Sequence, residues 1–253
     1  MKRFAWLLLP LVAGAIEPPT FDSLHAQCLD GEASACRQAL RLQGDDAELA
    51  STAGDVFMQA RRPAEAILAY RRAQRLGFPD EESLRARMAG AEAKRQTLLV
   101  ACETGLEDAA RRACDAALLP GAADEARILQ RRGSVQAALH RDSEALDDYL
   151  AAQRFNPQDR DLAQAVVRQA DATGRHDVAA LVGRGTALLA LRRPAEAVAP
   201  LRQALALEPG SRTLRAMLQG AEAEQPAATL ESTQFPAHGE QRFSNAAEAS
   251  FSH

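Results

Sequence analysis

Small and large apolar residues recur at the same spacing in three stretches of the chain, with polar residues between them. In each stretch a glycine is followed by an alanine after twelve residues, by a tyrosine or leucine after four more, and by a second alanine after another three. Small residues at such places let two antiparallel helices approach closely, and the larger residue fills the groove between them. The pattern predicts a helix pair in each of residues 47–80, 126–159 and 178–211. Its positions are Gly54, Ala66, Tyr70 and Ala73 in the first stretch, Gly133, Ala145, Tyr149 and Ala152 in the second, and Gly185, Ala197, Leu201 and Ala204 in the third.

Prolines agree with these helix boundaries. Proline is tolerated in the first turn of a helix, where its missing N–H group has no partner to lose, and it is common just after a helix end. Pro200 is the exception, because it falls inside the predicted helix of residues 194–207 and is expected to kink it. Pro63 and Pro194 are expected to open second helices, whereas Pro79, Pro157 and Pro209 follow helix ends.

The chain also repeats itself literally, since residues 61–66 and residues 192–197 both read Arg-Arg-Pro-Ala-Glu-Ala. Such self-similarity indicates an array in which each helix pair buries its apolar face against its neighbours. Additional helices are expected after the three pairs, so that the units are irregularly spaced. The final helix, over residues 212–224, is expected to act as a solvating cap. The additional helices are predicted over residues 82–96, 160–173 and 213–226.

The repeat resembles the tetratricopeptide repeat (TPR), whose unit of about 34 residues has small, large and proline positions at these offsets. The resemblance is good in the three stretches above and partial in residues 91–124, where Gly105 marks the turn and Cys114 stands in place of the usual aromatic residue. Residues 20–43 resemble the cysteine-linked, Sel1-like relatives of the same repeat. The resemblance covers residues 20–226 and implies an all-α, right-handed superhelical solenoid of antiparallel helix pairs, with about a dozen helices.

In arrays of this family the first helix of each pair lines a concave face, which binds an extended peptide or a helix of a partner protein. Toward the C-terminal end this face is apolar, with Val182 and Leu189, so a hydrophobic peptide side chain is expected there. The alternative is that these positions are ordinary solvated residues of a curved scaffold. The Lys/Asn arrangement with which some members bind a terminal carboxylate is missing, because no asparagine stands at these positions. The peptide-groove candidates are Asp55, Gln59, Gln130, Ser134, Val182, Thr186 and Leu189.

The N-terminus has the pattern of a secretory signal peptide. Lys2 and Arg3 precede an apolar run over residues 4–12, and residues 13–15 read Ala-Gly-Ala, which fits a cleavage site. The run is far shorter than the ~20 residues of a membrane-spanning helix, which disfavours an uncleaved anchor, and no cysteine follows it to carry a lipid. We therefore expect residues 1–15 to be removed and the protein to be periplasmic or secreted, without a stable membrane anchor.

Composition favours helices and disfavours nucleic acid as a partner. Hydrophobic residues make up 47% of the chain and aromatic residues only 4%. Alanine and leucine, both strong helix formers, dominate together with arginine, a mixture that we associate with a bacterial source. The formal charge of −4 becomes −6 once Lys2 and Arg3 leave with the signal peptide, so no cationic field remains to attract nucleic acid.

Four cysteines agree with export, because paired thiols are the rule in oxidising compartments. Three connectivities are possible, and we favour Cys28 with Cys36 and Cys102 with Cys114, since each pair is local and flanks a glycine turn. A zinc site is the alternative, but no C-x-x-C or H-x-x-x-H pattern accompanies the cysteines.

The composition changes after Gln225. Residues 227–253 contain few aliphatic residues and three phenylalanines spaced by eight, Phe235, Phe243 and Phe251. This segment is expected to be a flexible tail. Docking of the tail on the groove, recognition of the tail by a partner, and a merely solvated tail are all open.

No sequence motif indicates a catalytic site or a cofactor. Glu65 and Glu196, in the two copies of the repeated hexapeptide, are explained as first-turn residues that favour the positive end of a helix. None of the histidines has a spacing that pairs it with a serine or cysteine nucleophile. They are His25, His140, His176, His238 and His253.

The sequence thus predicts an exported, non-catalytic scaffold or adaptor that binds a peptide or protein of the cell envelope. The alternative is an accessory or docking subunit of an exported enzyme complex, in which the partner catalyses the reaction. The expected organisation is a signal peptide (residues 1–15), a TPR-like domain (residues 16–226) and a flexible tail (residues 227–253).

Overall fold

The computed structural model describes residues 19–224, and these residues form twelve α-helices and no strand. The predicted all-α class is therefore confirmed. The predicted signal peptide and the tail of residues 227–253 lie outside the described residues. In chain order the helices are α1 (Phe21–Leu29), α2 (Ala33–Leu42), α3 (Ala47–Gln59), α4 (Pro63–Arg75), α5 (Glu81–Thr104), α6 (Glu107–Ala117), α7 (Glu125–Ala138), α8 (Asp142–Gln153), α9 (Arg160–Thr173), α10 (Val178–Ala190), α11 (Pro194–Leu207) and α12 (Arg212–Ala223).

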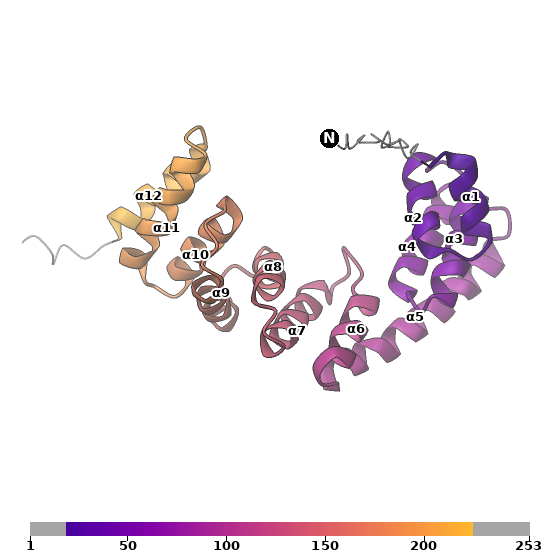
Figure 1. Cartoon of the computed structure of the whole chain (residues 1–253), viewed down its shortest axis with the longest axis horizontal. Coiled ribbons are helices and arrows are strands. Elements are labelled where there is room, and N and C mark those ends of the chain that lie inside the picture. The colour runs from indigo at the N-terminus through magenta and orange to yellow at the C-terminus, as the bar shows by residue number, and fades with distance from the viewer. Residues whose placement is uncertain (1–18, 225–253) are drawn as a thin grey trace, which may run out of the picture.

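Each helix packs against the next one, and the array bends into an open arch (Figure 1). Helices α1 to α5 form one arm, α6 to α8 lie at the bend, and α9 to α12 form the other arm. Besides consecutive helices, the main contacts join helices two apart, such as α1 with α3, α5 with α7 and α8 with α10. Contacts of this short range are those of a solenoid, in which each unit is stabilised by its neighbours. The fold is thus a TPR-like solenoid of helix pairs.

The predicted glycine positions are the places where paired helices touch. A Cβ atom built on Gly54 of α3 would lie 2.2 Å from Cε1 of Tyr70 on α4. The same construction on Gly133 of α7 gives 2.9 Å to Cε1 of Tyr149 on α8. On Gly185 of α10 it gives 2.7 Å to a methyl group of Leu201 on α11. Only glycine leaves room for these large side chains, so the three predicted helix pairs are confirmed.

Two disulfides occupy the place of the large residue in helix pairs that lack it. Cys36 of α2 bonds to Cys28 of α1, and Cys114 of α6 bonds to Cys102 of α5, which is the favoured connectivity. Cys36 and Cys114 are each followed after three residues by a buried alanine, as Tyr70 is. All four cysteines are buried. A covalent bond therefore joins the two helices where a side chain does so in the other pairs.

Tight turns in three of the helix pairs each place a non-glycine residue in the left-handed conformation. Arg61, His140 and Arg192 have φ values of 58°, 57° and 60°. At the first of these turns the N–H group of Arg62 donates to the carbonyl of Phe57 at 2.8 Å, the bond of a Schellman motif, and the other two turns have the equivalent bond. The repeated hexapeptide begins with this turn, so the same letters build the same helix connection twice.

Helix α5 differs from the expected units. It is one helix of 24 residues that joins the predicted helix of residues 82–96 to the start of the partial unit at residues 91–124. The only helix breaker inside it is Gly90, which is exposed, and a single exposed glycine lowers helix stability by only about 1 kcal/mol. The helix ends at Gly105, where the sequence predicts a turn.

Helix α9 stands alone between the pair α7–α8 and the pair α10–α11. Because it adds a single helix, the array changes phase, and α10 packs beside α8. Helices α7 and α9 therefore lie in one layer and α8 and α10 in the other.

Helix α11 contains Pro200 in its interior, as predicted, and the proline is buried. The helix continues because its face with Ala197, Leu201 and Ala204 is completely buried. The kink expected at Pro200 stays a prediction.

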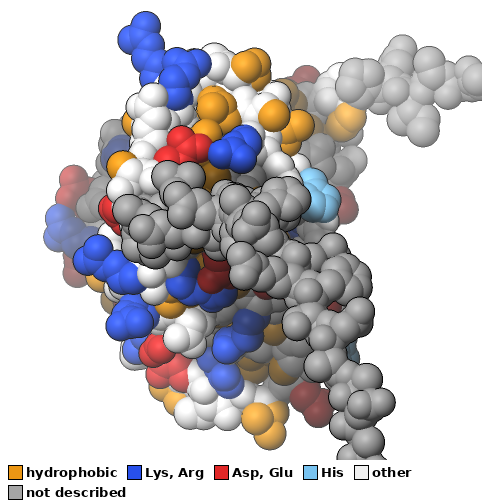
Figure 2. All heavy atoms as spheres, turned by 90° about the vertical axis from the view of Figure 1, so that its left-hand side faces the viewer, with side chains coloured by type: hydrophobic (Ala, Val, Ile, Leu, Met, Phe, Trp, Pro, Cys, Tyr) orange, Lys and Arg blue, Asp and Glu red, His pale blue; other side chains and the backbone are white. Residues whose placement is uncertain are grey.

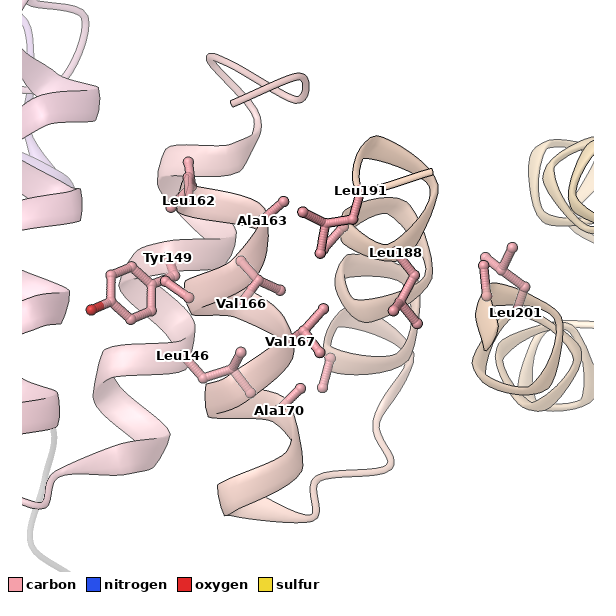
Figure 3. Close-up of a cluster of buried hydrophobic side chains, with 14 of the residues drawn as sticks. Leu146, Tyr149, Leu162, Ala163, Val166, Val167, Ala170, Leu188, Leu191 and Leu201 are labelled. Atoms are coloured by element: carbon pink, nitrogen blue, oxygen red, sulfur yellow. The ribbon is translucent and has the colours of Figure 1, made fainter. Parts of the chain in front are cut away.

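The largest core cluster lies under α8, α9 and α10 and includes Leu146, Val166 and Leu188 (Figure 3). A second cluster connects α1 to α5. Among the described residues no helix combines the length and apolar character needed to cross a membrane.

The helix contact at Gly54 can be tested with a matched alanine substitution. Gly54→Ala should lower the free energy of unfolding by about 1–3 kcal/mol, because the added methyl group overlaps the Tyr70 ring. Gly90→Ala should instead raise it by about 0.5–1 kcal/mol, since no atom lies within 4 Å of a Cβ there and alanine favours the helix. Urea unfolding followed by circular dichroism measures both values. Equal changes in the two variants would contradict the role of the glycine.

The disulfide between Cys28 and Cys36 should stabilise the N-terminal pair by restricting the unfolded chain. Replacing both cysteines by serine should lower the free energy of unfolding by about 2–3 kcal/mol, the value for closure of so short a loop. Urea unfolding without and with a reductant measures the effect. Without reductant the double variant keeps the bond between Cys102 and Cys114. Its unfolding midpoint should therefore differ from that of the oxidised wild type, which has both bonds, and from that of the fully reduced wild type, which has none. An unfolding midpoint equal to that of the oxidised wild type would contradict the prediction.

Candidate protein-binding grooves

An open groove with a volume of about 410 Å³ runs between α7 and α9, and we call it the α7–α9 groove. Tyr149 of α8 lies at its bottom and is 6% exposed. Two of the predicted groove residues line it, Gln130 and Ser134. The complete lining is Arg127, Gln130, Arg131, Ser134, Tyr149, Asp161, Ala165 and Arg168.

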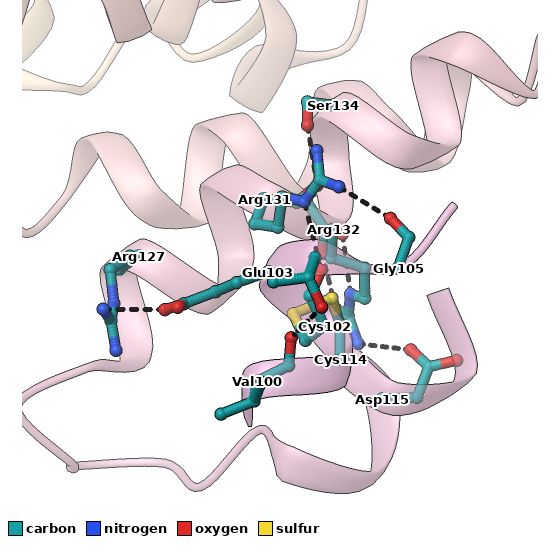
Figure 4. Close-up of a disulfide and its surroundings, with 12 residues drawn as sticks. Val100, Cys102, Glu103, Gly105, Cys114, Asp115, Arg127, Arg131, Arg132 and Ser134 are labelled. Atoms are coloured by element: carbon teal, nitrogen blue, oxygen red, sulfur yellow. Dashed lines mark hydrogen bonds and ion pairs between the residues drawn. A yellow bond between two sulfur atoms is a disulfide. The ribbon is translucent and has the colours of Figure 1, made fainter. Parts of the chain in front are cut away.

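Two arginines of the groove, Arg127 and Arg131, bind groups at the C-terminal end of α5. Arg127 pairs with Glu103 at 2.7 Å (Figure 4). Arg131 donates to the carbonyl of Cys102 at 3.1 Å and to that of Gly105 at 3.0 Å. Carbonyls at a helix C-terminus have no partner within the helix, so Arg131 caps α5 next to the disulfide.

Arg132 connects α7 to α8 and to α6. Its guanidinium group binds both carboxylate oxygens of the buried Asp148 on α8, at 2.6 and 2.7 Å, and reaches Asp115 of α6 at 2.8 Å. The bond to Asp148 raises the pKa of Arg132, which stays charged. Together with Arg131 this arginine holds the α7 wall of the groove against α5, α6 and α8.

The remaining basic side chain of the groove is available to a ligand. Arg168 of α9 is exposed and forms neither a hydrogen bond nor an ion pair within residues 19–224. Within the same residues the hydroxyl group of Tyr149 has no hydrogen-bond partner. Burial raises the pKa of Tyr149, and the positive charge of Arg168 opposes this effect. The two groups therefore share one electrostatic environment at the groove.

The corresponding place between α3 and α5 is already filled. The Tyr70 hydroxyl group donates to Asp55 at 2.7 Å, and Arg87 of α5 donates to the other carboxylate oxygen of Asp55 at 2.8 Å. Arg87 also donates to Ser51 at 3.1 Å. Asp55, a predicted groove residue, thus has internal partners, and Gln59 is exposed near the end of α3.

Two further grooves flank α10. The α8–α10 groove contains Val182 and Thr186, and the α10–α12 groove contains Thr186 and Leu189. Pro157 lines both of them, so they meet at the loop between α8 and α9. The hydroxyl group of Thr186 donates to the carbonyl of Val182 in its own helix at 2.8 Å.

The predicted candidates therefore do not line one continuous groove. Gln130 and Ser134 lie in the layer of α7 and α9, whereas Val182, Thr186 and Leu189 lie in the layer of α8 and α10. The cause is the single helix α9. It shifts the first helix of the next pair, α10, into the layer that second helices occupy before it. The sequence pattern assigned α10 as a first helix correctly but could not show on which face it lies.

The groove residues that the sequence analysis missed are Arg127, Arg131, Tyr149, Asp161, Ala165 and Arg168. The pattern marks Tyr149 as a core residue, and it is one, but its hydroxyl end reaches the groove. Arg168 lies in the helix that the repeat does not include. In the sequence, the one indication of Arg168 is a charge that directly follows two valines, Val166 and Val167, which are buried.

The remaining chemical candidates have structural roles. Glu65 binds Arg62 at 2.6 Å and Arg37 at 2.7 Å, and Glu196 binds Arg193 at 2.5 Å, each in the first turn of its helix. No cluster of potential metal ligands occurs among residues 19–224. Two of the histidines, His238 and His253, lie outside these residues.

The C-terminal end of the array carries side chains of all three kinds. Basic, acidic and hydrophobic side chains are all visible on the described part of this face (Figure 2).

The raised pKa values of Tyr70 and Tyr149 predict that the protein unfolds at alkaline pH. Burial and, for Tyr70, the hydrogen bond to Asp55 raise both pKa values in the folded state, whereas the unfolded side chains ionise near pH 10. A pKa raised on folding gives stability that is complete below pH 10 and is lost as the pH rises further. Tyrosinate absorbance should therefore appear together with the loss of helical circular dichroism, because the chain has only these two tyrosines. Tyr70→Phe should weaken the pH dependence above pH 10. Tyrosinate formation near pH 10 in a fully helical protein would contradict this assignment.

No known family's model matches the sequence, and no curated protein matches it. Solved structures of similar helical arrays include MamA, with 17% identity and a TM-score of 0.28 over 72% of this chain and 99% of that chain. YrrB, described as a TPR protein with an unusual peptide-binding site, has 17% identity and a TM-score of 0.24 over 78% of this chain and 85% of that one. The TPR2AB domain of yeast Sti1, in a complex with pHSP90, has 15% identity and a TM-score of 0.26 over 80% and 86%. At these TM-scores the likeness carries no weight for function, and the TPR-like fold follows from the helix pairs described above.

Proposed function

We propose that this protein is an exported, non-catalytic scaffold that binds an extended segment of a cell-envelope protein in the α7–α9 groove. The observation that carries the proposal is the open groove itself, which is lined by Arg168 and Tyr149, and neither of these side chains has a hydrogen-bond or ion-pair partner among residues 19–224. An open groove between two helices, lined mostly by polar side chains around Tyr149 and Ala165, suits an extended peptide with polar side chains. Scaffolds of stacked helices bind along such surfaces and need no enclosed reaction pocket.

Export is supported by the two buried disulfides and by the predicted signal peptide of residues 1–15. Disulfides persist in oxidising compartments such as the bacterial periplasm. One of them, the bond between Cys102 and Cys114, also lies next to the proposed binding surface, because Arg131 of the groove donates to the carbonyl of Cys102. We therefore expect the groove to be fully formed only in the oxidised protein.

The proposal can be tested by blocking the groove. Ser134→Trp places a large side chain in the α7–α9 groove, whereas Gln203→Trp adds the same side chain at an exposed position of α11, away from this groove. Each tagged protein is exposed to a periplasmic extract, and captured proteins are quantified by mass spectrometry. Capture of the wild type's partner should fall at least about tenfold with Ser134→Trp, because loss of roughly 1.4 kcal/mol of binding energy already has this effect. Capture by Gln203→Trp should be unchanged.

Equal capture by both variants, with helical circular dichroism intact, would contradict the proposed site. The identity of the captured protein separates the scaffold from the second hypothesis. Recovery of one enzyme in stoichiometric amount would indicate a docking subunit of an enzyme complex.

A further inference from the structure

We infer that the α7–α9 groove binds an aspartate or glutamate side chain of the partner, with the carboxylate held between Arg168 and the hydroxyl group of Tyr149. This inference rests on the proposed function and specifies the ligand of the same groove. It comes from a comparison of two repeats of the same chain.

The first repeat shows what the arrangement binds. Tyr70 packs on Gly54, and its hydroxyl group donates at 2.7 Å to the carboxylate of Asp55, the residue that follows Gly54. The second oxygen of that carboxylate accepts from Arg87 of the following odd-numbered helix at 2.8 Å. One carboxylate thus satisfies a tyrosine from α4 and an arginine from α5.

The second repeat has the tyrosine and an arginine but no carboxylate. Tyr149 packs on Gly133 as Tyr70 does on Gly54, and α9 supplies Arg168. The residue after Gly133 is Ser134, whose hydroxyl group donates to the carbonyl of Arg131 in its own helix at 2.8 Å. The acceptor of the first repeat is therefore absent, while the two donors remain and face the groove.

The third repeat lacks both the tyrosine and the acceptor. There the residue on Gly185 is Leu201, which has no hydroxyl group, and the next residue is Thr186, bonded within its own helix. No donor requires a carboxylate in this repeat. Only the second repeat has the donors without their acceptor.

The charges of the groove also favour an acidic ligand. Arg127 is neutralised by Glu103, and the one acidic residue of the lining is Asp161. Arg131 is bonded to carbonyl groups, which leave its positive charge uncompensated, and Arg168 has no partner among the described residues. A carboxylate accepting from both Arg168 and Tyr149 would form charge-assisted hydrogen bonds, which are about twice as strong as neutral ones.

A titration with model peptides tests this inference on the mature protein. The probes are a capped peptide that alternates alanine with glutamate and its counterpart with glutamine, and binding is followed by nuclear magnetic resonance at low salt. The glutamate peptide should shift signals of α7 and α9 and bind at least about tenfold more tightly than the glutamine peptide, the gain expected for a hydrogen-bonded charge.

Three variants separate the groove from general charge attraction. Arg168→Gln should abolish the preference for glutamate. Arg160→Gln removes the same charge from an exposed position of α9 outside the groove and should leave the preference intact. Ser134→Asp supplies the carboxylate of the first repeat and should lower binding of the glutamate peptide about tenfold or more.

Equal affinity for both peptides, or loss of the preference in Arg160→Gln, would overturn the inference and leave the groove as a peptide site. Absence of shifts in α7 and α9 would overturn it as well. The effect of Ser134→Trp on partner capture tests the proposed function independently. If the glutamate peptide binds only after deletion of residues 227–253, the chain's own tail occupies the groove of the intact protein, and the assignment of the groove to a partner is overturned.

Discussion

The fold depends on one kind of close contact, which recurs between the two antiparallel helices of each pair. In three pairs a tyrosine or leucine rests on a glycine of the partner helix, and in two pairs a disulfide connects the same places. Both devices fix the distance between the helices and let alanines pack around the contact. Each pair then presents a similar apolar surface to the next pair. An array of this kind needs no central core, because every helix is covered by its neighbours along the chain.

Arginine side chains connect the pairs to one another. Arg131 reaches from α7 to the last carbonyls of α5, and Arg72 reaches from α4 to the carbonyls of Leu40 and Gly44 at the end of α2. These carbonyls have no partners within their helices, so an arginine from another helix satisfies them and sets the position of its own helix. Arginines of this chain therefore link one helix pair to the next as well as forming ion pairs within helices.

The same repeat position has a structural role in one unit and faces solvent in another. Asp55 closes the space between α3 and α5 from within, whereas Ser134 leaves the space between α7 and α9 open. Repeats that share their buried residues can therefore differ at one exposed residue, and this difference decides where the array has a groove. Stability depends on the glycine and tyrosine, which both units keep, so the exposed residue can change without loss of the fold.

The sequence by itself determined the helix pairs, since spacing of glycine, tyrosine and alanine follows directly from the geometry of two touching helices. It also indicated the disulfides, because the cysteines lie on neighbouring helices, close in the chain. It placed only Gln130 and Ser134 at the α7–α9 groove. The single helix α9 reversed the layers of the later helices, and the contact of Tyr149 with the groove required α9 to lie beside α7. Such relations join residues from three helices, and only the tertiary structure decides them, because a repeat pattern describes each pair alone and not the rotation from one pair to the next.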